Sequence, residues 1–375
     1  MRNTLKRVMA VVMIAAMLAT ALCFVGCGNE KGNETYFIGA TGPLTGDAAD
    51  YGIAVNNGAK IAIDEINAAG GLNGVLFSYE MKDDKATAAD ATTGYNALMD
   101  SGMQISIGSV TSGSCEAFAA ESVKDNLFFI TPSASAANVI ENRPNAFRVC
   151  FGDPDQGVLA AQDLAANFSK IGVIYDTSDP YSYGIYAAFE AEMKTLGKTY
   201  EVRTFDKDNN KDFSAQVEAL KDCDVIFLPF YYTEAGLVAK TCAAKGCAAV
   251  LYGCDGLDGI AGQIDASVTN KIKYITPFNV NATDEKTANF VKKYRETYGV
   301  DPSQFAADGY DAIYVIYEAM KAAGVNDVNI SAADLCQMVV AAITAENFQY
   351  VGTTGTMTWD VSGAATKVPV IVELQ

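Results

Sequence analysis

Short apolar runs alternate with segments of helical periodicity from Tyr36 onward, and this alternation limits what the chain can fold into more than any other feature. Such a rhythm is typical of α/β units, in which helices connect the strands of a largely parallel sheet. The candidate strands cover residues 36–40, 75–81, 104–110, 127–131, 146–151, 170–176, 200–205, 224–230, 249–253, 272–278 and 368–374. They are too many for one sheet of ordinary size, so the sequence predicts two doubly wound, Rossmann-like lobes.

The chain is expected to pass from the first lobe to the second near residues 150–153 and to return near residues 276–277. Helices are then predicted over residues 287–298, 305–323 and 332–345. In open α/β sheets, ligands bind outside the carboxyl ends of the strands. The residues directly after each apolar run are therefore the candidates for a binding site.

The amino terminus carries Arg2, Lys6 and Arg7, followed by an apolar stretch over residues 8–25 and then by Gly26 and Cys27. A basic start, an apolar run and a small residue at its end are the pattern of a secretory signal peptide.

The residues around Cys27 resemble a bacterial lipobox, although Phe24 stands where a leucine is usual. We therefore predict a lipoprotein signal peptide over residues 1–27, lipidation of Cys27, and a linker over residues 28–34. The alternative is an uncleaved helix, since the apolar run is just long enough to span a bilayer. Both interpretations place the rest of the protein outside the cytoplasmic membrane, lipid-anchored in the first.

After residue 27, 24 basic residues face 45 acidic ones, so the remaining chain has a net charge near −21. Such a balance excludes nucleic acid as a partner, because nucleic-acid binding needs basic surface to contact the phosphates. The acidic residues are spread along the chain without a block of like charges, which indicates a solvated surface.

The sequence contains no histidine, and this absence excludes Ser–His and Cys–His nucleophilic pairs. The glycine-rich loop over residues 41–52 lacks the lysine and the spacing of a phosphate-binding P-loop. Seven cysteines follow the leader, none paired as CxxC, so at least one thiol stays unpaired within the chain. We expect no enzyme, no cofactor and no metal site.

Hydroxyl-bearing loops follow two strands of the first half, over residues 111–118 and 132–138. Serines and threonines at helix starts suit a carboxylate, although they also serve as simple N-caps. Tyrosines and acids follow strands of the second half, over residues 176–184, 230–236 and 253–259. A ligand with a carboxylate at one end and an ammonium group at the other would match both sets.

These loops resemble, in order, those of the branched-chain amino acid-binding proteins among the type I periplasmic binding proteins. The resemblance extends from about Thr35 to the C-terminus and is most specific at residues 42–52, 66–71, 130–135, 183–184 and 358–360. It implies two lobes joined by three crossing segments. The N-terminal lobe would comprise residues 35–152 plus 277–367, and the C-terminal lobe residues 153–276 plus 368–375.

The resemblance also implies a set of ligand-binding residues. Three serines would bind the α-carboxylate and α-amino group, one acid would pair with the ammonium, and aromatic side chains would line the pocket. These residues are Ser112, Ser133, Ser135, Asp255, Tyr51, Phe305, Tyr183 and Tyr231. The acid departs from the family, which commonly has a glutamate where Asp255 stands, and the shorter side chain changes how a ligand amine must be placed.

By the same resemblance, the protein would be a monomer that captures an amino acid, branched-chain or otherwise hydrophobic, and delivers it to the permease subunits of an ABC importer. Two alternatives stay open. The ligand could be an aromatic amino acid, an amide or a carboxylate, and the chain could be a ligand-sensing module, because sensory domains share this architecture.

Overall fold

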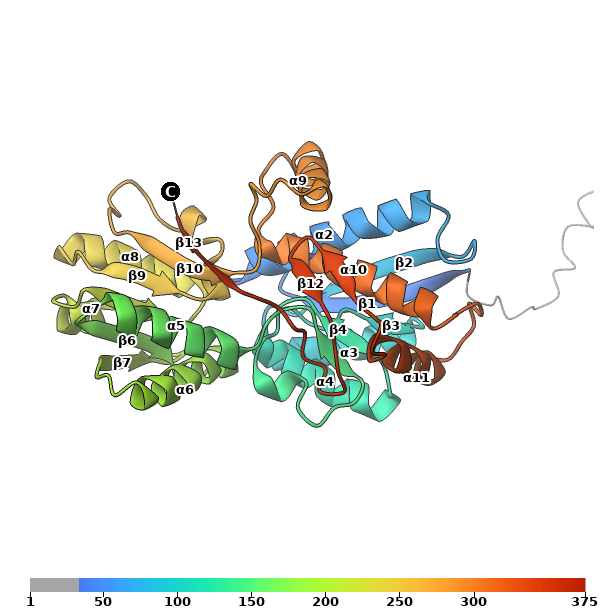
Figure 1. The fold of residues 1–375 in the computed structure, drawn as a ribbon, viewed down its shortest axis with the longest axis horizontal. Coiled ribbons are helices and arrows are strands. Elements are labelled where there is room, and N and C mark those ends of the chain that lie inside the picture. The colour runs from blue at the N-terminus through green and yellow to red at the C-terminus, as the bar shows by residue number, and fades with distance from the viewer. Residues whose placement is uncertain (1–33, 375) are drawn as a thin grey trace, which may run out of the picture. The chain divides into compact units, whose positions relative to one another are not determined.

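The strands of the computed structural model, which describes residues 34–374, form two main sheets (Figure 1). The first sheet has the order β2-β1-β3-β4-β5 and is wholly parallel. Its strands are β1 (Thr35–Gly42), β2 (Leu76–Asp83), β3 (Ile105–Ser106), β4 (Phe129–Thr131) and β5 (Ala146–Arg148). The predicted alternation of strands and helices is confirmed, and each predicted strand overlaps an observed one.

The second sheet has the order β13-β10-β9-β8-β6-β7 and is parallel except for its edge strand β13, which runs antiparallel to β10. Its strands are β6 (Ile171–Asp176), β7 (Glu201–Phe205), β8 (Val225–Leu228), β9 (Val250–Gly253), β10 (Ile272–Thr276) and β13 (Val370–Glu373). A small antiparallel pair consists of β11 (Tyr350–Gly352) and β12 (Gly355–Met357). The chain thus returns to the second sheet at its end, and Figure 1 shows β13, in red, beside β10.

Helices connect the parallel strands and cover both faces of the sheets, which explains why central strands such as β8 are buried along their whole length. The helices are α2 (Ala49–Ala68), α3 (Ala88–Asp100), α4 (Ser112–Asp125), α5 (Asp153–Asn167), α6 (Pro180–Thr195), α7 (Ser214–Leu220), α8 (Tyr232–Lys245), α9 (Glu285–Tyr298), α10 (Gln304–Ala322) and α11 (Ala332–Ile343). Short 3₁₀ turns lie at η2 (Ala137–Val139), η3 (Asp255–Leu257) and η4 (Ile260–Gly262). No helix within residues 34–374 is both long and apolar enough to cross a membrane.

The third strand is much shorter than its apolar run, which was predicted to be a strand over residues 104–110. The observed strand ends at Ser106 because Gly108 adopts a positive φ of 65°, a conformation that breaks a strand. A Cβ at Gly108 would also lie 2.8 Å from Cδ2 of Phe129. The chain therefore leaves the sheet early and forms a loop before α4.

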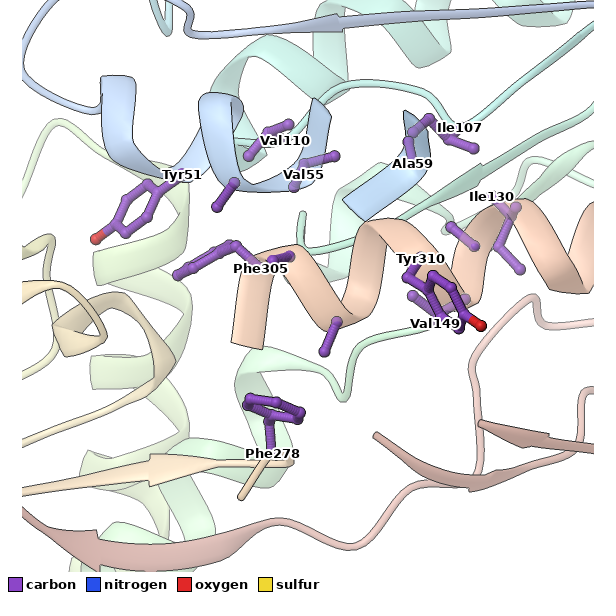
Figure 2. Close-up of a cluster of buried hydrophobic side chains, with 14 of the residues drawn as sticks. Tyr51, Val55, Ala59, Ile107, Val110, Ile130, Val149, Phe278, Phe305 and Tyr310 are labelled. Carbon is purple, nitrogen blue, oxygen red and sulfur yellow. The ribbon is translucent and has the colours of Figure 1, made fainter. Parts of the chain in front are cut away.

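Helices α2 and α10 pack so closely that their backbones touch. A Cβ at Gly58 of α2 would lie 1.9 Å from the carbonyl oxygen of Ala306, and one at Gly309 of α10 would lie 2.5 Å from that of Val55. Both contacts are far inside van der Waals distance, so only glycine fits at either position. Figure 2 shows the side chains buried around this contact, with α2 above α10.

A buried ion pair joins segments that are distant in sequence. The ammonium of Lys367, which lies shortly before β13, is 3.0 Å from Asp308 Oδ1 on α10 and donates a 2.8 Å hydrogen bond to the carbonyl of Val149. The two charged side chains are 1% and 2% exposed. The indole of Trp359 also donates to the carbonyl of Arg148, so the last part of the chain is held against the segment that follows β5.

Replacing Lys367 by Met should lower the free energy of unfolding by about 3–5 kcal/mol, because it leaves Asp308 buried without its partner. Urea denaturation followed by circular dichroism would measure the change. The matched control is Lys292→Met, which removes an exposed pair with Glu296 and should have little effect. Equal stability of the two variants would show that the buried pair does not hold these segments together.

Candidate ligand site

Each sheet has a place where its strand order reverses, and the carboxyl ends of the strands there open onto one cavity. The reversal lies between β1 and β3 in the first sheet and between β6 and β8 in the second. Such switch points are where α/β sheets bind ligands, because the following helices leave to opposite faces. Residues that follow these strands, β4 and β9, with one from the start of α10, line the cavity: Tyr51, Val110, Thr111, Ser112, Ser133, Tyr181, Tyr231, Asp255, Gly256 and Phe305.

The cavity is almost filled by its own lining, with a volume of about 10 Å³, about the space that one water molecule needs. The lining residues must therefore move apart before an organic solute can enter. A second, more open hollow lies beside it and shares Thr111 and Tyr231 with its lining. The cavity therefore has an outward-facing side next to the first turn of α6.

The polar wall from the first sheet centres on the start of α4. Its N-cap residue Thr111 makes no side-chain capping bond, and its hydroxyl is buried without a hydrogen-bond partner. The hydroxyl of Ser112 accepts a 3.2 Å bond from Ala136 N, and that of Ser133 donates a 2.7 Å bond to the carbonyl of Val110. An uncapped helix start of this kind presents N–H donors to an anion.

Ser135 does not line the cavity, although it was predicted to bind the ligand. Its side chain is wholly buried, and its backbone carbonyl accepts hydrogen bonds from Asp153 N and from Arg148. The residue thus lies behind the wall that Ser133 forms, where it supports the segment that follows β5. In a regular strand Ser133 and Ser135, two residues apart, would share a face, but the chain bends at residues 132–133, directly after β4.

Aromatic rings form the apolar walls. The rings of Tyr51 and Phe305 are 4.1 Å apart between centroids, and those of Tyr51 and Tyr231 are 5.5 Å apart. Figure 2 shows Tyr51 on α2 and Phe305 on α10 extending toward the same side of the cluster. On the other side, Tyr231 stacks on Tyr181 with centroids 5.0 Å apart. Most of the cavity surface near these residues is therefore flat and apolar.

The hydroxyl of Tyr51 connects the two halves of the site directly. It donates a hydrogen bond to the carbonyl of Gly256 and accepts a 3.1 Å bond from the backbone N–H of Tyr232. Tyr51 follows the first sheet's β1, whereas Gly256 and Tyr232 follow strands of the second sheet. Burial raises the pKa of Tyr51 well above its ordinary value, so the hydroxyl keeps its proton for this bond.

Asp255 is the acid of the cavity. Its side chain accepts a 2.6 Å hydrogen bond from the hydroxyl of Tyr181, and its backbone N–H donates to Gln156 at 3.0 Å. Burial raises the pKa of Asp255 to about 6, while the bonds from Tyr181 and Gln156 and the charge of Lys367 oppose the rise. No ion pair within 4 Å reaches Asp255 among residues 34–374. A buried acid without a cation beside it suits a ligand that brings one.

Tyr183 lies outside the cavity, with its side chain 56% exposed, and Tyr181 occupies the place predicted for it. Helix α6 begins at Pro180, and two residues of a helix separated by two positions differ by about 200° in direction. The sequence did contain a signal for this register. Asp179 followed by Pro180 is the pattern of an N-cap and a first helical residue, and it places Tyr181 in the first turn.

Six of the eight predicted binding residues therefore meet at one cavity: Tyr51, Ser112, Ser133, Tyr231, Asp255 and Phe305. The prediction missed Tyr181, Thr111, Val110 and Gly256. Within residues 34–374, no group of three or more potential metal ligands is present.

Two doubly wound sheets with a small, mixed polar and aromatic cavity at their switch points define the class of two-lobed solute-binding proteins. The chain belongs to the periplasmic binding protein family, whose pattern it matches over residues 35–367. It is 30% identical over 296 residues to Leu/Ile/Val-binding protein homolog 1 of Brucella abortus, an alignment that covers 76% of this chain and 78% of the relative. Its relatives are binding proteins, so the interpretation as a non-enzyme is confirmed.

Solved structures show the same fold. The leucine-binding protein LivK of Thermotoga maritima matches with a TM-score of 0.80 and 25% identity, over 90% of this chain and 95% of that one. The branched-chain amino acid transporter substrate-binding protein LivJ of Streptococcus pneumoniae, in complex with isoleucine, matches with a TM-score of 0.77 and 27% identity, over 91% and 100%. The predicted type I periplasmic binding protein fold is confirmed.

The raised pKa of Asp255 predicts a pH-dependent stability of the unliganded protein. The value is about 6 in the folded state and about 3.9 in an unfolded chain, so the folded state holds the proton more tightly. The acid therefore lowers stability as pH rises from about 4 through 6. Asp255→Asn should raise the free energy of unfolding at pH 8 by up to about 3 kcal/mol.

The measurement is urea denaturation of both proteins without ligand at pH 4 and pH 8. The gain should fall to about 0.5 kcal/mol at pH 4, where the folded-state carboxyl is protonated and the unfolded-state carboxyl is about half protonated, so the acidic samples serve as the control. A variant that is no more stable than wild type at pH 8 would contradict the assignment of Asp255 as an uncompensated buried acid.

Proposed function

We propose that this protein is the substrate-binding component of an ABC importer and captures a hydrophobic α-amino acid, with the branched-chain amino acids first. One observation supports this most: the buried, cation-free Asp255 and the uncapped start of α4 border the same small cavity. An acid and a helix N-terminus are complementary to an ammonium group and a carboxylate. Relatives that are named as Leu/Ile/Val-binding proteins, and a similar structure that holds isoleucine, support the same ligand class.

In this proposal each side of the cavity has one task. The free N–H groups at the start of α4, with Ser112 and Ser133, bind the carboxylate, and Asp255 binds the ammonium group. The rings of Tyr51, Tyr231, Tyr181 and Phe305 surround the side chain, where they exclude water from it. Ser135 supports the carboxylate side from behind, and Tyr181 replaces Tyr183 in the second half.

We assign residues 35–152 plus 277–367 to the N-terminal lobe and residues 153–276 plus 368–375 to the C-terminal lobe, in line with the membership of the two sheets. The segments between these ranges would act as hinges, and the lobes would close on the ligand. Closure would be driven by contacts that exist only when both lobes touch the ligand. The bonds from Tyr51 to Gly256 and Tyr232 would help to hold the closed form together.

Calorimetric titration of the protein lacking residues 1–27 tests the ligand class. L-Leucine, L-isoleucine or L-valine should bind, whereas 4-methyl-2-oxopentanoate, which lacks the amine, and isoamylamine, which lacks the carboxylate, should bind at least 100-fold more weakly. L-Phenylalanine and benzoate are included because the walls are aromatic. Tighter binding of benzoate than of every amino acid would overturn the zwitterion proposal.

Two variants locate the ammonium site in the same titration. Asp255→Asn should weaken binding of the best amino acid by about 2–5 kcal/mol, because the ligand ammonium would be buried unpaired. Tyr183→Ala is the matched control and should retain wild-type affinity, since its side chain lies outside the cavity. The reverse pattern would restore the original prediction for Tyr183.

We further propose that Cys27, which lies outside the described residues, carries the lipid anchor that keeps the protein at the outer face of the cell membrane. Cys27→Ala should release the full-length protein into the soluble fraction after cell disruption, because stable anchoring depends on the acyl chains. Cys23→Ala is the control and should stay with the membranes. Membrane association of both variants would instead indicate an uncleaved N-terminal helix.

A further inference from the structure

The end of helix α8 brings two cysteines together. The N–H of Cys247 donates a 2.9 Å hydrogen bond to the carbonyl of Cys242, and the N–H of Gly246 donates a 3.3 Å bond to that of Ala243. Gly246 has a positive φ of 68°. These two bonds around a left-handed glycine are the Schellman motif, which brings the side chains at its first and last positions into contact. Those positions are Cys242 and Cys247.

Both side chains point into the core rather than toward solvent. Cys242 is wholly buried and Cys247 is 4% exposed, and both belong to the apolar cluster around the second sheet. Burial raises the pKa of the Cys242 thiol, and the neighbouring Cys247 thiol raises it further. A third thiol, that of Cys223, is 9% exposed and lies near Cys247. Three thiols, those of Cys223, Cys242 and Cys247, therefore lie near one another beside the second sheet.

We propose that Cys242 and Cys247 form an intrachain disulfide when the protein meets a disulfide oxidant outside the cytoplasmic membrane. The family is extracytoplasmic, and such compartments sustain protein disulfides. All seven cysteines of the described residues carry free thiols in this structure. The pair is therefore the reduced form of the proposed bond.

The reaction is a thiol–disulfide exchange with two steps. The thiolate of one cysteine attacks a sulfur of the oxidant, forms a mixed disulfide and releases one oxidant thiol. The second cysteine, as its thiolate, attacks the protein sulfur of that mixed disulfide, and the second oxidant thiol leaves. The two protein thiols are oxidised, the oxidant disulfide is reduced to two thiols, and the two protons of the cysteines pass to them.

Access to the oxidant requires the last turn of α8 to open, because both thiols are buried in the folded protein. Helix ends are the part of a helix that frays most readily. Once formed, the bond would fix the carboxyl end of α8. The amino end of the same helix begins at Tyr232, next to the cavity residue Tyr231. The disulfide would thus hold in place the helix that carries one wall of the site.

Peptide mapping tests the proposal. The protein lacking residues 1–27 is incubated with oxidised glutathione, its remaining thiols are alkylated in denaturant, and it is digested with trypsin. Cleavage after Lys245 separates the two cysteines, so the bond links peptide 241–245 to peptide 246–271. We expect five alkylated cysteines and this linked pair. Seven alkylated cysteines, or a link from peptide 246–271 to the Cys223 peptide 222–240, would overturn the proposal.

Serine variants identify the sulfurs, because peptide 246–271 also contains Cys254. Cys247→Ser should abolish the link, and Cys254→Ser should retain it. Cys336→Ser is a matched control, since this thiol is also buried but lies on α11. A link that survives Cys247→Ser would assign the bond to Cys254 and contradict the proposal. If one of these variants folds poorly, the peptide mapping of the unaltered protein still tests whether the two peptides are linked.

Discussion

The reversal of strand order in each parallel sheet is the constraint on which the rest of this structure depends. Where the order reverses, the helices that follow neighbouring strands leave to opposite faces, and the backbone between them cannot close over the carboxyl edge. In the first sheet this leaves room between the residues after β1 and those after β3, and in the second between the residues after β6 and β8. The cavity is where these two gaps meet, so its position follows from topology before any side chain is considered.

Side chains then decide what the cavity can hold. The uncapped start of α4 and the buried carboxyl of Asp255 are both unfavourable in an empty protein, because each is a polar group taken from water without full compensation. Either would be easy to remove: a serine or aspartate at position 111 would cap the helix more strongly, and an asparagine at position 255 would carry no charge. In the proposed function the ligand would be the missing partner of both groups. Stability and affinity would then depend on the same residues in opposite directions.

The sequence predicted the fold well because strands and helices in this protein are local features. Each predicted strand overlaps an observed one, and the helices predicted over residues 287–298, 305–323 and 332–345 are found with their ends shifted by at most two residues. The errors concern the ends of single elements and not their number or order. The strand expected over residues 104–110 is shortened by the positive φ of Gly108, where a Cβ would also lie 2.8 Å from Phe129 on the neighbouring strand. A contact between strands is not visible in a local pattern.

The site was predicted in part for the same reason. Residues in the loops after strands, such as Ser112 and Asp255, could be placed at this edge because their position needs only the strand to be known, whereas Tyr51 was assigned by the family resemblance. The choice between Tyr181 and Tyr183 needs the register of a helix start, because an error of two residues there moves a side chain out of the cavity. The choice between Ser133 and Ser135 needs the conformation of the bend that follows β4. The N-cap pattern at Asp179 and Pro180 would have settled the first choice. No comparable sequence pattern distinguishes Ser133 from Ser135.

The touching backbones of α2 and α10 limit how this receptor can change during evolution. Tyr51 stands near the start of one helix and Phe305 near the start of the other, and the contact between the helices leaves no space for a side chain at Gly58 or Gly309. The distance between the two helices that carry these rings is therefore set by main-chain contact, and side-chain substitutions elsewhere do not change it. A preference for a larger or smaller solute would therefore arise by replacing Tyr51 or Phe305 themselves, or by changing the loops after β6, β8 and β9 on the opposite wall, while the two helices keep their positions.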